Sequence, residues 1–480
     1  MADDSKTILK NLFIASLFCF ALLSAINKAW VSDDAFITFR YIQNFLDGKG
    51  LVYNEGERVE GYTNFLFLLL NAGWGFLGFD LVYASLFLGI LFYGFLIILS
   101  SKLSDSFQLG SLNLVFVGIC TTFHLQIFAT SGLETMSFCF FLFWGLVHSK
   151  LENFKVSSLA FALAALSRPE GNLFLGFYCI FLFLKKKEVY CIFPLVVVAL
   201  HVLFRYFYYG DLFPNTFYAK SDGMSYFSQG LTYWRLFFFS YPIYLLGFFS
   251  LFSLPFFLFG DRKFYLFQIF FPVTFYCFYV IWVGGDFMFS RFWIPILPYL
   301  LLSLSLFFLN MSWNRITIVF FLLCMIRIDP YKKTQIPAIQ GIFEEYKLYS
   351  LQDIQNFRKH LVPLGMEWKE KGYRVAIGGS EAFMAYYLNP IYVLEASTGL
   401  TDRELARKKL GERGLVGHEK KATEEDLRKR KIDILLFPGI LPNIDRRYLF
   451  QIKETPIQFL LLQPNLLKEF RTNPLLLSLP

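Results

Sequence analysis

Two adjacent aspartates, Asp33 and Asp34, directly follow the first long apolar segment of the sequence. Neighbouring carboxylates repel each other, so one of the two pKa values is expected to rise, which makes that group a proton acceptor. The pair is therefore a candidate general base, and it could also help to bind a divalent cation, Mg²⁺ or Mn²⁺. The alternative is an acidic cap at the start of a helix. A cap needs only one acid, which favours the catalytic interpretation.

Further polar residues follow the acidic pair. Arg40 lies about two helical turns later, where it could neutralise the acids, bind a phosphate group or form an ion pair within its own helix. Glu60, Tyr62 and Asn64 surround Gly61 in a turn-forming stretch, which is typical either of contacts to sugar hydroxyls or of a turn. Glu134 lies in another short polar segment, SGLET at 131–135.

Two more polar segments combine charges with a helix-breaking residue or glycines. Arg168 and Glu170 flank Pro169, so a helix should end there and leave both charges facing a cavity, or paired with each other. Asp286 and Arg291 follow Gly284 and Gly285 and could likewise bind a ligand or form a structural ion pair.

The segment 208–220 contains Asp211, Asn215 and Lys220 beside three tyrosines. Aromatic rings next to carboxamide and carboxylate groups suit carbohydrate, although tyrosine is also a common anchor at the membrane interface. We predict that the acids and amides of these segments contact a substrate.

The composition separates the chain into two parts. Of its 480 residues 56% are hydrophobic and 62 are Phe, yet residues 329–480 hold more than half of the charged residues. We therefore predict a membrane domain over 1–328 and a water-soluble domain over 329–480. The seven cysteines all lie in apolar stretches and none has ligand spacing. The basic residues do not form one stripe, so no nucleic acid partner is expected.

Apolar stretches of the first part predict about eleven membrane spans. They cover residues 8–30, 81–101, 111–129, 134–148, 156–167, 172–184, 188–207, 239–259, 264–283, 292–310 and 315–328. The apolar segment 64–79 is short and rich in glycine, which favours an interfacial or re-entrant helix. The Lys/Arg bias of the loops places the N-terminus inside and the polar segments, together with 329–480, outside.

The second part predicts a small α/β domain. Residues 373–379 and 431–437 are strand candidates, with helices expected over 380–388 and 422–431. The charged stretch 403–431 is most simply a solvated helix face, or else part of a platform that covers the membrane cavity, with Glu395 and His418 pointing toward it. The glycines at 378–379 could form an anion site at a helix start.

No nucleotide-binding motif is present: the sequence lacks GxxxxGK[ST], and no GxGxxG opens a helix after a strand. An enzyme that works outside the cytoplasm has no nucleotide-activated donor, so a lipid-linked substrate is more plausible.

Taken together, the motifs resemble a known family. An acidic pair at the outer end of the first span, followed by an amphipathic loop, is similar to the GT-C membrane glycosyltransferases. The segments SDDAFITFRY, GLVYNEGERVEGYTNF, SGLET, RPEG, GDLFPNTFYAK, GGDF, GLTD and GHEK resemble the terminal β-(1→2)-arabinofuranosyltransferase branch, in the same order along nearly the whole chain. One departure is Glu395, where relatives often have Asp.

The resemblance implies a glycosyltransferase of the bacterial inner membrane that uses a polyprenyl-phosphate sugar as donor, with Asp33 or Asp34 as the catalytic carboxylate. It also implies that cationic side chains hold the donor phosphate, and the candidates by position are Arg40, Arg168, Lys220 and Arg291. The acceptor would be a glycan or glycolipid of the cell envelope on the periplasmic side, and the active site would contact membrane lipid. The sugar would be arabinofuranosyl or a related pentosyl or hexosyl residue. The alternative is a flippase or transporter of lipid-linked sugars, but the sequence shows no convincing internal repeat, and its acids cluster at one face.

Overall fold

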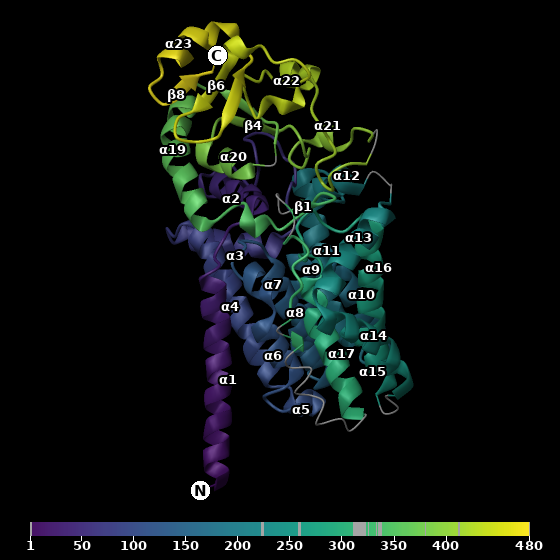
Figure 1. Cartoon of the computed structure of the whole chain (residues 1–480). Coiled ribbons are helices and arrows are strands. Elements are labelled where there is room, and N and C mark those ends of the chain that lie inside the picture. Colours follow the sequence, from purple (N-terminus) through teal and green to yellow (C-terminus); the bar gives the residue numbers. More distant parts are fainter. Residues whose placement is uncertain are drawn as a thin grey trace.

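A computed structural model describes residues 2–221, 225–257, 261–310, 323–324, 326–332, 334, 338–379, 381–410 and 413–479. Most of the first 310 residues form helices that run beside one another in a bundle. A mixed β-sheet with its own helices covers one end of that bundle (Figure 1). The N-terminus lies at the far end of the bundle from this sheet (Figure 1).

The helical part contains long helices and several short ones. Its helices are α1 (Ala2–Ile26), α2 (Asp33–Leu46), α3 (Phe65–Phe76), α4 (Leu81–Ser101), α5 (Ser104–Phe107), α6 (Leu114–Thr121), α7 (Phe123–Phe128), α8 (Thr135–Lys150), α9 (Phe154–Ser167), α10 (Gly171–Leu184), α11 (Val189–Tyr209), α12 (Asn215–Ser221), α13 (Phe227–Ser240), α14 (Pro242–Phe257), α15 (Arg262–Tyr265), α16 (Phe271–Val283) and α17 (Leu297–Asn310). A π-helical turn, Leu266–Phe270, joins α15 to α16, and a 3₁₀ turn, Ile294–Ile296, precedes α17.

Among the described residues, four helices are long and apolar enough to cross a membrane: Thr7–Ile26, Leu81–Ser101, Val189–Tyr209 and Arg262–Val283. The count rises to five if α13 and α14 are counted as one span, although the chain bends by 110° between them. These helices support the prediction of a membrane protein. The larger number of eleven stays a prediction, because the remaining apolar helices are shorter than a bilayer crossing requires.

Several boundaries differ from those predicted. The range 111–129 is divided into α6 and α7, because Thr122 has an extended backbone and starts a second helix. Most of helix α13 lies between the predicted spans 188–207 and 239–259, and the sharp bend after it comes at Pro242, the first residue of α14. Most of the predicted span 315–328 lies outside the described residues, which include only 323–324 and 326–328 of this range.

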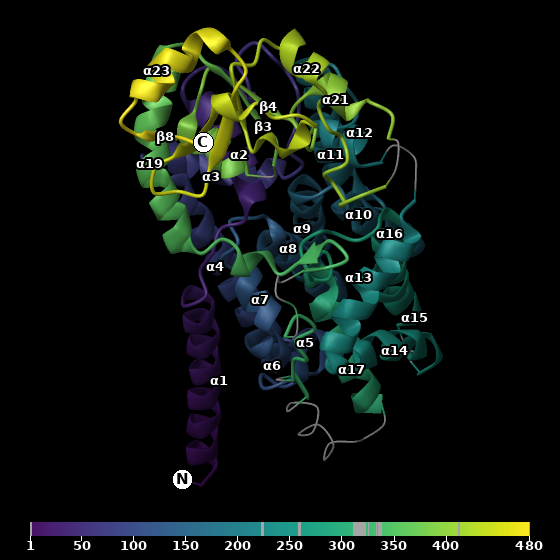
Figure 2. The ribbon, with the colours of Figure 1, turned by 45° about the horizontal axis from the view of Figure 1, so that its top comes forward.

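The C-terminal part contains a six-stranded sheet in the order β4-β3-β5-β7-β6-β8. Its strands are β3 (Arg374–Ile377), β4 (Tyr392–Glu395), β5 (Ile434–Leu436), β6 (Leu449–Ile452), β7 (Gln458–Leu461) and β8 (Leu476–Ser478). The first three strands pair in parallel and the others antiparallel. A separate two-stranded hairpin, β1 (Ala338–Ile339) with β2 (Ile342–Phe343), lies closer to the helical bundle (Figure 2).

The helices of this part are α19 (Leu351–Glu370), α20 (Ala382–Leu388), α21 (Arg403–Ala406), α22 (Glu424–Lys429) and α23 (Leu467–Thr472). The predicted strand and helix near 373–388 correspond to β3 and α20, and the predicted strand at 431–437 corresponds to β5. Apolar side chains of β3 and β5, such as Val375 and Ile434, are fully buried, as expected for parallel strands covered on both faces.

Helix α2 joins the two parts. Phe36 lies in this helix and contacts Phe383, Tyr386 and Tyr387 of α20, with ring centroids 5.5–6.2 Å apart. The same helix packs on α3 on its other side. Burial of these rings stabilises the contact between an N-terminal and a C-terminal helix. The first turn of α2, with its two aspartates, is therefore held directly beneath the sheet.

Candidate active site

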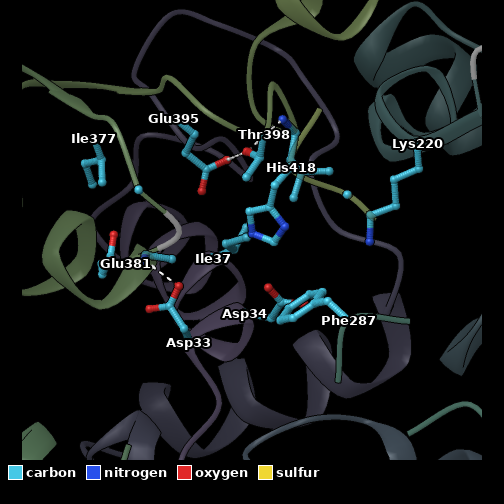
Figure 3. A pocket seen from close by; sticks show the side chains of 14 residues that line it. Asp33, Asp34, Ile37, Lys220, Phe287, Ile377, Glu381, Glu395, Thr398 and His418 are labelled. Carbon is cyan, nitrogen blue, oxygen red and sulfur yellow. Dashed lines mark hydrogen bonds between the residues drawn. The ribbon is translucent and has the colours of Figure 1, made fainter. Parts of the chain in front are cut away.

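A narrow pocket lies between the start of α2 and the loops at the carboxyl ends of β3 and β4 (Figure 3). Its space, about 20 Å³, holds about one water molecule. Five of the predicted site residues line it: Asp33, Asp34, Lys220, Glu395 and His418. The structure thus brings together side chains that are up to 385 positions apart in the sequence.

Asp33 is the first residue of α2, but its carboxylate binds another helix. It accepts hydrogen bonds from the backbone N–H groups of Ala382 (2.7 Å) and Phe383 (3.0 Å), at the start of α20. These are the amides of the predicted anion site after Gly379, and an acid of the chain itself occupies them. Burial raises the pKa of Asp33 well above its ordinary value, and the two amides oppose that shift.

Glu345 lies beside Asp33 and was not predicted as a site residue. It accepts hydrogen bonds from the Ser32 hydroxyl (3.2 Å) and from the backbone N–H of Asp33 (3.1 Å). Burial raises the pKa of Glu345 to about 8, and the nearby carboxylate of Asp34 adds to the shift. Nothing in the sequence around Glu345 distinguishes it from the other acids of the second part.

Asp34, in contrast to Asp33, belongs to a network of ion pairs around Arg291. Its Oδ2 accepts a hydrogen bond from Arg291 (3.1 Å), and its side chain keeps 24% of its surface exposed. The same guanidinium lies 3.5 Å from Asp286 and 3.6 Å from Glu134. Arg291 therefore holds three carboxylates together, and Asp34 is the member of this group that also lines the pocket.

The network continues to the end of α9. Arg168 binds Glu134 (2.6 Å) and makes two hydrogen bonds to Glu170 (3.2 and 3.0 Å). Asn64 donates to Glu134 (3.2 Å). The local Arg168–Glu170 pair that the sequence suggested is thus present, but it belongs to a larger cluster with more acids than bases. Burying such a cluster at the edge of the helical bundle costs free energy, and buried charges of this kind often mark a functional site.

Glu395 closes the opposite wall of the pocket. The hydroxyls of Thr401 (3.0 Å), Thr398 (3.3 Å) and Tyr53 (3.4 Å) donate to its carboxylate. Burial raises the pKa of Glu395 to about 7, although these hydrogen bonds lower it. Its charge therefore changes near neutral pH, within the pocket that contains Asp34.

His418 and Lys220 complete the pocket on the side away from Asp33 (Figure 3). The ring of His418 packs edge-on against Phe287, with centroids 5.0 Å apart. Burial lowers the pKa of His418, so its imidazole is neutral at pH 7. Lys220 is exposed at the end of α12 and forms no ion pair within the described part of the chain. Its ammonium group is thus available to an anion.

Arg40 does not line the pocket, contrary to the expectation from its helical spacing. Its guanidinium donates to the backbone carbonyls of Tyr53 (2.9 Å), Ala385 (2.8 Å) and Pro390 (3.2 Å), and to the side chain of Asn389. It therefore neutralises neither aspartate and forms no ion pair in its own helix. Arg40 instead attaches α2 to the end of α20.

Four other predicted substrate contacts also lie away from the pocket. Glu60 forms a buried ion pair with Arg205, and Tyr62 shares a hydrogen bond of 3.0 Å with Tyr209. Asn215 donates to the carbonyls of Gly399, Leu400 and Asp402. Asp211 pairs with Arg403 and Arg407. The contacts of Asn215 and Asp211 hold the segment 208–220 against α21 and the residues just before it. They therefore position Lys220.

The two aspartates do not form a divalent-cation site. Both oxygens of Asp33 accept amide hydrogens, whereas Asp34 binds Arg291. In the described ranges, no group of three or more His, Cys, Asp or Glu side chains is arranged to hold a metal ion. The donor set therefore does not fit Mg²⁺ or Mn²⁺, and no step is assigned to either ion.

Sequence comparisons agree with the motifs. The chain is 28% identical to the terminal β-(1→2)-arabinofuranosyltransferase of Mycobacterium tuberculosis over 238 residues, which cover 43% of this chain and 37% of that protein. It is 27% identical to the protein of the same name from Corynebacterium glutamicum over 272 residues, covering 46% of this chain and 38% of that protein. No family model matches. The predicted resemblance is confirmed. The chain is similar to terminal β-(1→2)-arabinofuranosyltransferases along less than half of its length.

Proposed function

We propose that this protein is a membrane glycosyltransferase that moves a sugar from a polyprenyl-phosphate donor to a glycan or glycolipid of the cell envelope. The observation that carries the proposal is the position of Asp34, an acid that lines the pocket while Arg291 holds it in place. Similarity to two named arabinofuranosyltransferases supports a sugar transfer. Arabinofuranose or a related pentose or hexose is the proposed sugar.

Asp34 is the proposed general base. An acceptor hydroxyl attacks the anomeric carbon, the bond from that carbon to the phosphate oxygen breaks, and Asp34 takes the hydroxyl proton. Polyprenyl phosphate leaves with the electron pair of the broken bond. Asp33 is a less suitable base, because both of its oxygens already accept hydrogen bonds from α20.

The departing phosphate needs positive charge beside it. Lys220 reaches the pocket and has no carboxylate partner in the described residues, so it suits this role. Arg291 and Arg168 are bound to acids, and we assign to them the positioning of Asp34 and its neighbours. Arg40 is occupied by carbonyl groups and is no longer proposed as a phosphate ligand.

We further propose that the pocket faces the periplasm from the bacterial inner membrane, with 1–328 as the GT-C membrane domain and 329–480 as the periplasmic domain. The Lys/Arg bias of the loops supports this orientation. The separation of the N-terminus from the sheet along the bundle also agrees with it (Figure 1).

The test is sugar transfer from labelled polyprenyl-phosphate donors in proteoliposomes. Asp34→Asn should lower kcat about 10²–10⁴-fold, which is the usual contribution of a general base. Asp47→Asn, at the other end of α2, is the matched control and should keep wild-type activity. Equal activity of Asp34→Asn and wild type would refute the assignment. Movement of intact donor across the bilayer without transfer would instead favour a flippase.

A further inference from the structure

A second cavity, about 570 Å³ in volume, lies beside the pocket and has no role in the proposed reaction. It forms an open groove between the start of α13, the turn of the β1–β2 hairpin and the segment 414–415. Within the described ranges, the residues that line it are Tyr226, Ser228, Gln229, Thr232, Gln340, Gly341, Gly414 and Leu415. We call this cavity the hairpin groove.

The hairpin groove has the chemistry of a site for a neutral polar ligand. None of the described residues that line it carries a charge, and these residues present three hydroxyls, two carboxamides and one aromatic ring. Hydroxyl and carboxamide groups can both donate and accept, as sugar hydroxyls do. A phosphate headgroup would need a cation in the lining, and a hydrocarbon chain would need an apolar wall. A carbohydrate chain fits this lining best.

A hydrogen bond and a cation–ring contact hold the walls of the groove in place. Gln340 and Gly341 form the two-residue turn of the hairpin, with φ values of 49° and 74°. The side chain of Gln229 donates to the Gln340 carbonyl (2.7 Å) and so binds the turn to α13. On the other side, the guanidinium of Arg413 lies over the Tyr226 ring, 4.8 Å from its centroid.

One short segment connects the groove to the pocket. Gly414 and Leu415 line the groove, while Gly417 and His418 line the pocket. The N–H of His418 donates to the Leu415 carbonyl (2.9 Å), so the chain turns between the two cavities. The β1–β2 hairpin also adjoins both cavities. Its turn lines the groove, and β2 exchanges hydrogen bonds with the segment that carries Phe287, a residue of the pocket.

We infer that the hairpin groove binds the acceptor glycan, several sugar units long, and directs its terminal hydroxyl past the 414–418 turn to Asp34. This inference rests on the proposed function and names the acceptor as an extended carbohydrate chain. The pocket itself holds about one water molecule, so it cannot also contain the body of such a chain. The larger groove provides that space.

Direct binding tests the inference without turnover. The full-length protein, purified in detergent, is titrated with a linear arabinofuranosyl hexasaccharide and with a linear mannose hexasaccharide, followed by ligand-observed NMR. At least one sugar should bind the wild type, and Ser228→Trp, which fills the groove from an exposed position, should weaken binding at least tenfold. Gln352→Trp, on the exposed face of α19, is the control and should bind as wild type does. No binding to the wild type, or unchanged binding to Ser228→Trp, would overturn the inference.

Kinetic measurements distinguish a defect in acceptor binding at the groove from a defect in the transfer reaction. Ser228→Trp should raise KM for the hexasaccharide about tenfold and leave KM for the polyprenyl-phosphate donor unchanged. Transfer to a short octyl glycoside, which does not fill the groove, should also stay unchanged. An equal loss with both acceptors would show that the groove has no specific role in binding the long acceptor, which would refute the inference. If the wild type transfers no sugar to either acceptor, the proposed function fails, and the binding titration alone decides whether the groove takes glycans.

Discussion

The carboxylate of Asp33 accepts a hydrogen bond of 2.7 Å from the backbone N–H of Ala382, so the first residue of α2 caps the first turn of α20. A second bond, from Phe383, uses its other oxygen. The acidic cap considered for the sequence therefore exists, but it caps a helix 349 residues away. The two adjacent aspartates thus have separate tasks, and mutations should separate them.

Asp33→Asn should destabilise the protein more than Asp34→Asn does. An asparagine has one side-chain oxygen, so one buried amide of α20 loses its acceptor, which costs about 1–3 kcal/mol. Asp34 is partly exposed, and its asparagine variant can keep an oxygen toward Arg291. Thermal unfolding in detergent measures the difference. Equal melting temperatures of the two variants would contradict the capping role of Asp33.

Substitutions of Arg291 should show that both the charge and the shape of its side chain matter for stability and activity. Arg291→Met leaves Asp34, Asp286 and Glu134 without their shared cation, and we expect a loss of about 3–5 kcal/mol in the free energy of unfolding, with no transfer activity. Arg291→Lys keeps the charge but cannot reach all three acids at once, so it should fold and retain reduced kcat. Full activity of Arg291→Met would show that the network does not position Asp34.

Substitutions of Lys220 should change KM for the donor and leave KM for the acceptor unchanged. Lys220→Ala should raise KM for the polyprenyl-phosphate sugar about tenfold or more and leave KM for the acceptor unchanged, since a charge-assisted bond to phosphate is lost. Lys220→Arg should restore most of the affinity. Steady-state kinetics with each substrate varied in turn gives both constants. A change in acceptor KM of the same size would place Lys220 elsewhere in the reaction.

Glu395 should make donor affinity depend on pH. Its pKa of about 7 means that it gains a negative charge in the pocket as the pH rises through neutrality. That charge repels the donor phosphate, so KM for the donor should increase above pH 7 in the wild type. Glu395→Gln has no charge to gain and should show a flatter profile. Parallel profiles for the two proteins would contradict this role.

Glu345 should make stability depend on pH in a predictable direction. Its pKa rises from the ordinary 4.5 to about 8 on folding, so between these values the folded protein keeps a proton that the unfolded chain has lost. The contribution of Glu345 to the free energy of unfolding therefore falls as pH rises from 4.5 to 8, and is most favourable below 4.5. Glu345→Gln should lack this fall. Unfolding curves at several pH values give the difference in slope.

The sequence predicted the membrane class, the acidic pair and several pocket residues, because their signals are local. Long apolar stretches identify helices, and Lys220, Glu395 and His418 stood in distinctive segments. The role of Arg40 could not be predicted, since its partners Ala385 and Pro390 are about 350 residues away. The break at Thr122 also carries no composition signal, because both flanking helices are apolar.

Glu345 shows a second limit. Its raised pKa comes from burial against Ser32 and Asp33, and burial of one acid among many depends on how distant segments pack. In the same way, Glu60 and Asn215 resembled ligand-binding residues because buried structural contacts and substrate contacts use the same polar groups. Residue type alone does not distinguish the two uses.

The walls of the pocket come from distant parts of the chain: Asp33 and Asp34 from its beginning, Lys220 and Phe287 from its middle, and residues between 377 and 418 from its last quarter. During synthesis, the ribosome makes the acidic pair long before it makes β3, α20 and β4. A nascent chain therefore carries the proposed base before the enclosed pocket exists. If the proposed function holds, incomplete chains should bind donor poorly and hydrolyse none of it, so the order of translation itself would delay sugar transfer until the whole protein has folded.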